Sequence, residues 1–210
     1  MRQHVNPLSK YFHEFEPIPH LSQIFKNPEL PLHIDIGCGS GRFLFDLALE
    51  NSNWNYLGIE IREKLVLNSK IKLKEIEINN LNFSYGNATL LIKDWLKKDK
   101  ISILDSVSFN FPDPWFKNKH HKRRVIQSDL IKDLNKLMKA ESLIFIKTDV
   151  KELFDHMDEI ILNTDYFIAI DFDKLDYLES FNPNQINTLR EEYALQNKLS
   201  IYKKIYKRIY

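Results

Sequence analysis

The amino-acid sequence predicts an α/β fold with a mostly parallel β-sheet and helices on both of its faces. Short apolar runs, typical of buried strands, alternate along the chain with segments whose apolar residues have the spacing of a helix. The chain has 210 residues and contains neither an internal repeat nor a low-complexity linker. We therefore expect one domain over residues 1–210.

Seven segments have the composition of β-strands. The first is an apolar run that ends at glycines, and the last alternates isoleucine with lysine, which is typical of a strand with a partly wet face. The expected strands cover residues 32–36, 54–59, 82–85, 103–109, 143–146, 166–170 and 201–209. Helical spacing is found at residues 42–50, 62–76, 126–137 and 150–161. Such folds bind ligands at the carboxyl ends of their strands.

Composition and charge exclude several classes of protein. Cys38 is the only cysteine, so we expect no disulfide framework and no cysteine-based metal site, and we assign no metal ligands. The first residues lack the apolar core of a signal peptide, and no run of about 18 apolar residues occurs. We therefore expect a cytoplasmic protein without a membrane partner. The net charge is only +1, so a polyanion would have to bind to a local cluster of cations.

The motif DIGCGSG directly follows the first expected strand. Its glycines, Gly37, Gly39 and Gly41, allow a tight turn and a close approach of the backbone to a ligand. Glu60 lies at the end of the second expected strand, where an acid can accept hydrogen bonds from both hydroxyls of a ribose. The turn and the acid together predict a cofactor that contains a nucleoside.

The spacing of the glycines favours S-adenosylmethionine over a dinucleotide. A dinucleotide motif has the form GxGxxG, whereas here the third glycine comes one residue early and Arg42 stands in its place. Asp35 precedes the turn, where a carboxylate repels a pyrophosphate but attracts the amino group of S-adenosylmethionine. Asn87 follows the third expected strand and is a candidate for the adenine edge, although Gly-Asn is also an ordinary turn. A nicotinamide-dependent oxidoreductase is the alternative.

The stretch FNFPDPWFKNKHHKRR joins a rigid acid to a dense group of cations. Asp113 follows the fourth expected strand and stands between two prolines, which restrict its backbone. This placement indicates a preorganised contact with a substrate. The alternative is a proline-rich turn in which Trp115 fills the core.

The cations after Trp115 predict a nucleic-acid partner, because lysine and arginine neutralise phosphates. We expect Lys122, Arg123 and Arg124 to contact the substrate in this way, with a solvated basic loop as the alternative. A second acid, Asp149, follows the fifth expected strand. Two acids inside a basic rim would match a purine edge that carries N–H donors. A nucleic-acid-binding module without catalysis would leave these acids unexplained.

Together these motifs resemble the bacterial tRNA (guanine-N7-)-methyltransferases. The resemblance covers nearly the whole chain and rests on RQHVNPL, DIGCGSG, YLGIE, NFPDPW with HxKRR, FIKTD and TLRE. It implies a Rossmann-like class I methyltransferase fold with an antiparallel C-terminal strand. It also implies transfer of a methyl group from S-adenosylmethionine to N7 of guanine 46 in the variable loop of tRNA. Residues 1–30 would then form an N-terminal extension near the tRNA site.

The resemblance also assigns roles to individual residues. Asp35, Glu60, Asn87 and Asp113 would line the methyl-donor site, and Asp113 would be the catalytic residue. Substrate contacts would come from Lys117, Asp149, Thr188 and Glu191.

Three positions depart from the family pattern. Many members have Glu in place of Asp35, Asp in place of Asn87 and proline in place of Phe116. The first two changes keep hydrogen-bonding groups, although Asn87 lacks a charge. Phe116 makes the loop less rigid, so the sequence leaves the place of Lys117 open. It also leaves open whether Asp113 accepts a proton, whether the tryptophan of PDPW stacks on the substrate, and whether the protein is a monomer or a homodimer.

Overall fold

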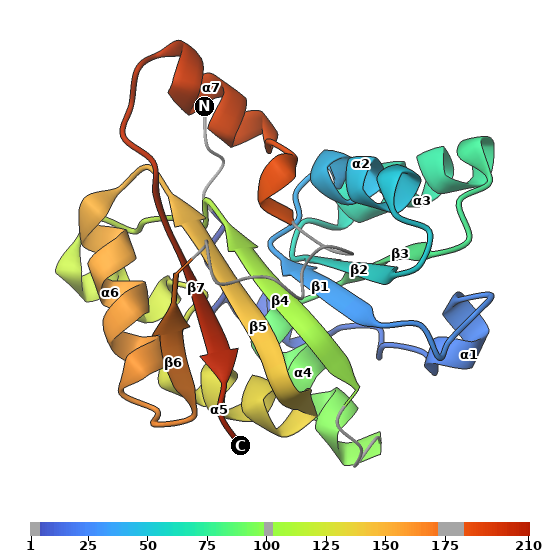
Figure 1. Ribbon diagram of the computed structural model, residues 1–210, viewed down its shortest axis with the longest axis horizontal. Coiled ribbons are helices and arrows are strands. Elements are labelled where there is room, and N and C mark those ends of the chain that lie inside the picture. Colours follow the sequence, from blue (N-terminus) through green and yellow to red (C-terminus); the bar gives the residue numbers. More distant parts are fainter. Residues whose placement is uncertain (1–4, 99–102, 172–182) are drawn as a thin grey trace.

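The computed structural model describes residues 5–98, 103–171 and 183–210, and these residues adopt the predicted α/β fold (Figure 1). Their strands form one sheet in the order β3-β2-β1-β4-β5-β7-β6. The strands are β1 (Leu32–Ile36), β2 (Asn55–Glu60), β3 (Leu81–Tyr85), β4 (Leu104–Asn110), β5 (Met138–Thr148), β6 (Phe167–Ile170) and β7 (Tyr202–Arg208). Only the pairings of β7, with β5 and β6, are antiparallel in this sheet. The predicted antiparallel C-terminal strand is therefore confirmed.

Helices cover both faces of this sheet, as predicted. They are α1 (Leu21–Ile24), α2 (Arg42–Glu50), α3 (Glu63–Ile76), α4 (Ala88–Lys98), α5 (Ser128–Leu137), α6 (Lys151–Leu162) and α7 (Leu189–Gln196). Short 3-10 turns are η1 (Lys10–His13), η2 (Asn118–Arg123) and η5 (Pro183–Gln185). In the described part of the chain, none of the helices has the length and apolar character that crossing a bilayer requires. The first part of the RQHVNPL motif, residues 2–4, lies outside the described residues.

Two hydrophobic clusters hold the layers together. The first joins α4, α5 and α6 to the sheet and includes Leu134. The second joins α2 and α3 to the sheet and includes Leu44. Neighbouring residues of β5 alternate between them, with Ile144 in the first cluster and Phe145 in the second. This alternation is what a strand that is covered on both faces produces.

Helices α1, α4 and α7 are missing from the predicted elements. The buried residues of α4 have helical spacing from Ala88 to Trp95, so its amphipathic signal is present in the sequence. Helix α7 is short, and its signal is the capping box that Thr188 forms with Glu191. Strand β5 also begins at Met138, earlier than predicted, because its first residues pair with β4 across a register shift.

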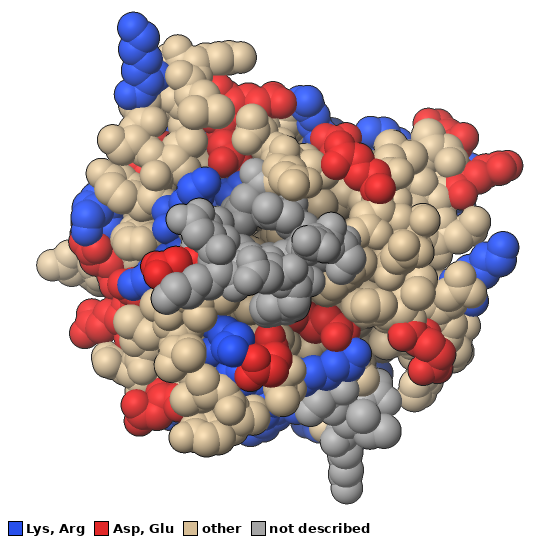
Figure 2. Space-filling view, viewed as in Figure 1, with Lys and Arg blue, Asp and Glu red and all other residues tan. Residues whose placement is uncertain are grey.

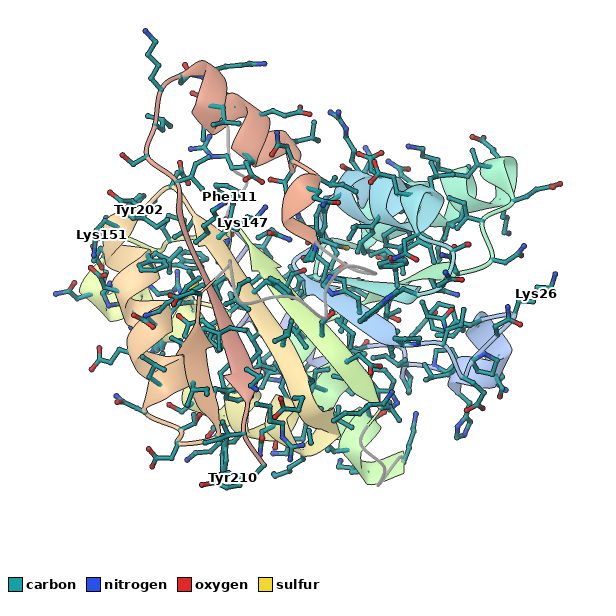
Figure 3. All side chains as sticks on the ribbon, in the orientation of Figure 1. Lys26, Phe111, Lys147, Lys151, Tyr202 and Tyr210 are labelled. Atoms are coloured by element: carbon teal, nitrogen blue, oxygen red, sulfur yellow. The ribbon has the colours of Figure 1, made fainter. Side chains whose placement is uncertain are left out.

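The parallel pairing places the carboxyl ends of β1, β2, β4 and β5 at one edge of the sheet. Strand β1 lies between β2 and β4, which is the topological switch point of this fold. Phe111 and Lys147 lie near one another at this edge in Figure 3, and the Phe111 N–H donates to the Lys147 carbonyl at 2.7 Å. Side chains that follow these four strands therefore meet, although they are far apart in the sequence.

The start of α2 packs closely against β3. Gly41 caps this helix with a φ of +72°, and a Cβ at this position would lie 2.4 Å from the ring of Phe83. That ring packs in turn against Phe45, with 5.4 Å between the ring centroids. The third glycine of the DIGCGSG motif is therefore required for helix–sheet packing as well as for its backbone angle.

Replacement of Gly41 by alanine should lower the free energy of unfolding by about 2–4 kcal/mol, because backbone strain adds to the clash with Phe83. Gly37→Ala is the matched control, since Gly37 also has a positive φ (+83°) but has no atom within 4 Å of the added methyl group. It should cost only about 1–2 kcal/mol. Urea unfolding of both variants measures the difference. Equal losses would show that the contact with Phe83 has no cost.

Candidate functional site

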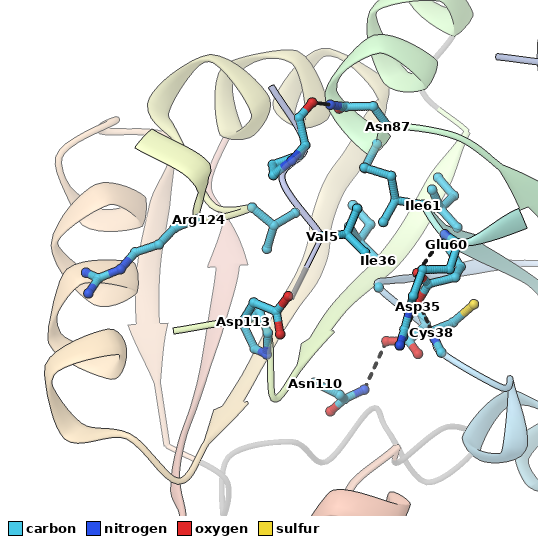
Figure 4. Close-up of a pocket in the computed structure, with 18 of the residues that line it drawn as sticks. Val5, Asp35, Ile36, Cys38, Glu60, Ile61, Asn87, Asn110, Asp113 and Arg124 are labelled. Atoms are coloured by element: carbon cyan, nitrogen blue, oxygen red, sulfur yellow. Dashed lines mark hydrogen bonds and ion pairs between the residues drawn. The ribbon is translucent and has the colours of Figure 1, made fainter. Parts of the chain in front are cut away.

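A cavity of about 560 Å³ lies at the carboxyl ends of β1, β2 and β4 (Figure 4). Its volume is in the range of small-molecule sites. The predicted site residues that line it are Asp35, Gly37, Gly39, Glu60, Asn87, Asp113, Lys122, Arg123, Arg124 and Thr188. Those outside the lining are Gly41, Lys117, Asp149 and Glu191. The fold therefore brings most of the predicted donor-site residues together around one cavity.

The glycine turn has backbone angles that favour glycine. Gly37 and Gly39 have φ values of +83° and +61°. The N–H groups of Gly37 and Cys38 donate to the carbonyl of Ile59, at 2.8 and 3.2 Å, and so bind the turn to β2. The N–H of Gly39 donates to the carboxylate of Glu60 at 2.9 Å. The turn thus contacts the acid that is predicted to hold a ribose.

Glu60 is buried at the end of β2, and its carboxylate accepts four hydrogen bonds. Gly39 donates one of them, and Arg62 donates three. In Arg62, the backbone N–H and Nε each lie 2.9 Å from Oε1, and Nη2 lies 3.1 Å from Oε2. A buried carboxylate is stable only with such donors. Arg62 also lines the cavity and is absent from the predicted site. The feature of the sequence that could have indicated Arg62 is its position two residues after Glu60.

Asp35 is buried at the end of β1, next to β4. Ser108 Oγ and Asn110 Nδ2 donate to its Oδ1 at 2.6 and 3.0 Å, and both donors come from β4. Burial raises the pKa of Asp35 to about 6, while the two hydrogen bonds act in the opposite direction. The carboxyl group of Asp35 therefore changes its charge near pH 6.

His33 extends this network into the protein interior. Its Nδ1 lies 2.6 Å from Ser106 Oγ, and its Nε2 lies 3.0 Å from Ser108 Oγ. Burial lowers the pKa of His33 to about 3, so the ring is neutral at pH 7. Because Ser108 donates its proton to Asp35, it accepts from the Nε2–H of His33, and Nδ1 accepts from Ser106. The neutral ring thereby directs the Ser108 hydroxyl toward Asp35.

Asn87 connects the N-terminal segment to the cavity. Its Oδ1 accepts from the Thr89 N–H at the start of α4, and its Nδ2 donates to the Pro7 carbonyl, each at 3.0 Å. Val5, Pro7 and Leu8 also line the cavity. The amide thus positions part of the N-terminal extension beside the site. The place of that extension near tRNA stays a prediction.

The loop after β4 has an unusual backbone on both sides of Asp113. Phe111 and Trp115 have φ values of +49° and +44°, which few residues with side chains adopt. Arg124 follows this loop in the sequence. Its guanidinium donates to the Pro114 carbonyl at 2.8 Å and so holds the loop in place. Asp113 is thereby presented to the cavity on a segment that its neighbours hold in place.

The prediction that Arg124 belongs to an exposed basic rim is wrong. Arg124 is only 3% exposed, and its guanidinium also binds His121 Nε2 at 2.9 Å and Glu152 at 2.6 Å. Figure 4 shows the guanidinium pointing away from Asp113. Its role in the structure is to bind the PDPW loop to the neighbouring helix α6.

The remaining cations of this segment are more accessible. Lys117 and Lys122 are exposed, and Arg123 is half-buried with its guanidinium carbon 5.0 Å from the centre of the Trp115 ring. Trp115 is also half-buried and packs edge-on against His120, so it does not fill the core. On the face shown in Figure 2, acidic and basic residues are interspersed.

The predicted substrate residues beyond β5 take part in contacts within the protein. Asp149 forms an ion pair with Arg190, which lines the cavity. Glu191 is buried and pairs with Lys147 at 3.0 Å. Thr188 caps α7 by accepting from the N–H of Glu191 at 3.1 Å. A contact of these residues with a substrate stays a prediction.

Comparison with known families shows what the chain is related to. Residues 29–204 match the Methyltransf_4 family model, which is described as "Putative methyltransferase". The chain belongs to this family. The match runs from the segment before β1 into β7 and includes every predicted site residue of the methyltransferase.

Relatives of full length are also found. A tRNA (guanine-N(7)-)-methyltransferase of Prochlorococcus marinus subsp. pastoris (strain CCMP1986 / NIES-2087 / MED4) is 59% identical over 100% of both chains. One with the same name from strain NATL1A is 38% identical over 98% of this chain and 96% of its own. Among solved structures, the aminoglycoside resistance methyltransferase NpmB1 has a TM-score of 0.56 at 17% identity and covers 90% of each chain. The Rossmann-like methyltransferase fold is thus confirmed.

The raised pKa of Asp35 should make the methyltransferase lose stability as the pH rises. The unfolded carboxyl ionises near pH 4, whereas the folded one ionises at about pH 6. Ionisation therefore favours the unfolded chain between these values, by up to about 3 kcal/mol. Asp35→Asn should remove this part of the pH dependence and raise the free energy of unfolding at pH 8. Urea unfolding from pH 4 to 8 measures both. Identical profiles would contradict the burial of this charge.

Proposed function

We propose that this protein transfers a methyl group from S-adenosylmethionine to N7 of guanine 46 in the variable loop of tRNA, and that it acts in the cytoplasm. The observation that carries the proposal is the placement of three carboxylates, those of Asp35, Glu60 and Asp113, around one cavity. The names of the full-length relatives support the substrate. The resemblance in the loop motifs supports the position within tRNA.

The acids of β1 and β2 suit the polar groups of the methyl donor. S-adenosylmethionine supplies an electrophilic methyl group on a sulfonium. Glu60 would accept hydrogen bonds from both ribose hydroxyls, and Asp35 would attract the amino group. The glycine turn allows the backbone to approach the donor closely. Asn87 remains the candidate for the adenine edge, because it lines the same cavity.

Asp113 suits the acceptor side of the reaction. N7 of guanine has a free lone pair and no proton, so no base is needed at the attacking atom. The product purine is cationic. Asp113 would orient the base by accepting from N1–H and the amino group, and its charge would stabilise the positive charge that develops. Further acceleration would come from holding the two reactants in line.

The accessible cations around the cavity suit the phosphates of tRNA. Lys122 and Arg123 line the cavity, and Lys117 is exposed at the start of η2. Trp115 is half-buried beside them and offers a ring for stacking with an exposed base. Exposure of a stacked guanine costs a few kcal/mol, which phosphate contacts can offset.

The direct test of the function is incubation with unmodified tRNA and S-adenosylmethionine that carries a labelled methyl group. Mass spectrometry of the digested nucleosides should find the label in 7-methylguanosine, and sequencing should place it at position 46. Label in another atom or another nucleotide would overturn the proposed function.

Replacement of Asp113 by alanine or asparagine should reduce methylation by about 100-fold or more, because the base loses its orienting charge. Binding of S-adenosylhomocysteine, measured by calorimetry, should change little, since Glu60 and the glycine turn are intact. Full activity in either variant would remove Asp113 from the catalytic role.

The structure separates two kinds of cation after the PDPW motif. Replacing both Lys122 and Arg123 by alanine should weaken tRNA binding and reduce the slope of log K against log salt by about one to two. Stability should stay within about 0.5 kcal/mol. Arg124→Ala should leave the slope unchanged but cost about 1–3 kcal/mol of stability, since the Pro114 carbonyl loses a buried donor. A reduced slope for Arg124→Ala would contradict its structural role.

A further inference from the structure

A chain of buried hydrogen bonds ends on the carboxyl group of Asp35. Ser108 Oγ lies 2.6 Å from Asp35 Oδ1 and 3.0 Å from His33 Nε2. Ser106 Oγ continues the chain at 2.6 Å from His33 Nδ1. Each of these four side chains is at most 2% exposed. Because so little of them meets solvent, each depends on its neighbours in the chain for its hydrogen bonds.

The two oxygens of Asp35 differ in what they contact. Oδ1 accepts from Ser108 Oγ and Asn110 Nδ2, and these are the two hydrogen bonds that the described residues make to this side chain. Figure 4 shows the bond from Asn110. Asp35 also lines the cavity, so Oδ2 is the oxygen that is left to accept from a ligand. Strand β4 thus holds one oxygen within the protein and leaves the other for the cavity.

Asp35 must be ionised to attract an ammonium group, and part of its surroundings opposes this. Burial is the main cause that raises its pKa to about 6, and the charge of Glu60 on β2 raises it further. The hydrogen bond from Ser108 has the largest effect in the opposite direction, followed by the bond from Asn110 and the charge of Lys147 on β5. The Ser108 hydroxyl is therefore the main group that keeps this carboxylate charged.

Two other titratable groups beside Asp35 keep their charge over the same pH range. Burial lowers the pKa of His33 to about 3, so its ring stays neutral and its Nε2–H can donate to Ser108. Burial also raises the pKa of the Cys38 thiol in the glycine turn well above its ordinary value, so this thiol stays protonated. Of these three groups, Asp35 is the one that changes its charge between pH 5 and pH 8.

We propose that Ser108 and His33 are positioning residues for the methyl donor, which keep Asp35 charged with Oδ2 toward the cavity and so set the pH above which the donor binds tightly. This inference rests on the proposed function for the contact between Asp35 and the amino group of the donor. Below that pH, binding of the ammonium group requires Asp35 to release its proton, so donor affinity is linked to pH. Ser108 and His33 are not among the residues that line the cavity, so both act through Asp35.

The first experiment measures this link by calorimetry with two compounds. S-adenosylhomocysteine has the amino group of the donor, whereas 5′-methylthioadenosine has the adenine and the ribose but no amino group. In the unchanged protein, the affinity for S-adenosylhomocysteine should fall about tenfold from pH 8 to pH 5, because Asp35 gains a proton. The affinity for 5′-methylthioadenosine should change by less than about twofold. An equal fall for both compounds would overturn the proposal, since the amino group would then have no part in the pH dependence.

Two buried serines of β4 separate the role of Ser108 from a general loosening of the strand. In Ser108→Ala, the pH midpoint of S-adenosylhomocysteine binding should move upward by about one pH unit, because the carboxylate loses its strongest donor. Ser106→Ala is the matched control, since it removes an equally buried hydroxyl that binds the other nitrogen of the same imidazole. Its midpoint should move by less than about 0.3 pH unit. Equal shifts in the two variants, or no shift in Ser108→Ala, would overturn the proposal.

A third variant tests whether His33 acts through Ser108. His33→Phe keeps an aromatic ring beside Phe43 and Tyr56 but removes both nitrogens. Alone it should move the midpoint upward by about half a pH unit, because the Ser108 hydroxyl is no longer directed toward Asp35. In a Ser108→Ala background it should cause no further shift, and a second shift of the same size there would overturn the role of His33. These outcomes are distinct from failure of the proposed function, which would appear as absence of tRNA methylation by the unchanged protein.

Discussion

Two buried carboxylates, Asp35 and Glu60, are the constraint on which the rest of this site depends. They lie at the ends of neighbouring strands, and the charge of Glu60 raises the pKa of Asp35 further. Each needs donors that the surrounding structure must supply. Strand β4 supplies them to Asp35, and the glycine turn together with Arg62 supplies them to Glu60. The tight turn after β1 is thus both a way to approach a ligand and a source of hydrogen bonds.

A second set of charges binds the C-terminal part of the chain to the same edge of the sheet. Arg190, Glu191 and Glu192, which are consecutive in α7, pair with the residue after β5, with β5 itself and with α2. Thr188 caps the helix and lines the cavity. Figure 1 shows α7 beside the carboxyl ends of β4 and β5. Three consecutive residues of α7 therefore attach the helix, beside the site, to three different parts of the chain through ion pairs.

Asp35, Glu60, Asp113 and two of the three predicted glycines line the cavity at the strand ends where periodicity and motif spacing placed them, because both signals are local properties of the chain. The cations were harder to assign. Lys122 and Arg124 are two residues apart, yet Lys122 is exposed while Arg124 is buried against Glu152. Arg62 is absent from the prediction because its importance comes from filling the acceptor positions of Glu60, which depends on side-chain direction and not on residue type.

The sequence by itself determined the order of the strands along the chain, the glycine turn and the acids at the ends of β1, β2 and β4. It could do so because hydrophobic periodicity and backbone restrictions act over a few residues. The tertiary structure alone decided which charged groups meet. The parallel register brings Glu60, Arg62 and Asp113 to one cavity, and burial makes Asp35 a carboxyl group with a pKa of about 6. Both results require neighbours from distant parts of the chain, since desolvation and charge pairing exist only after the strands have packed.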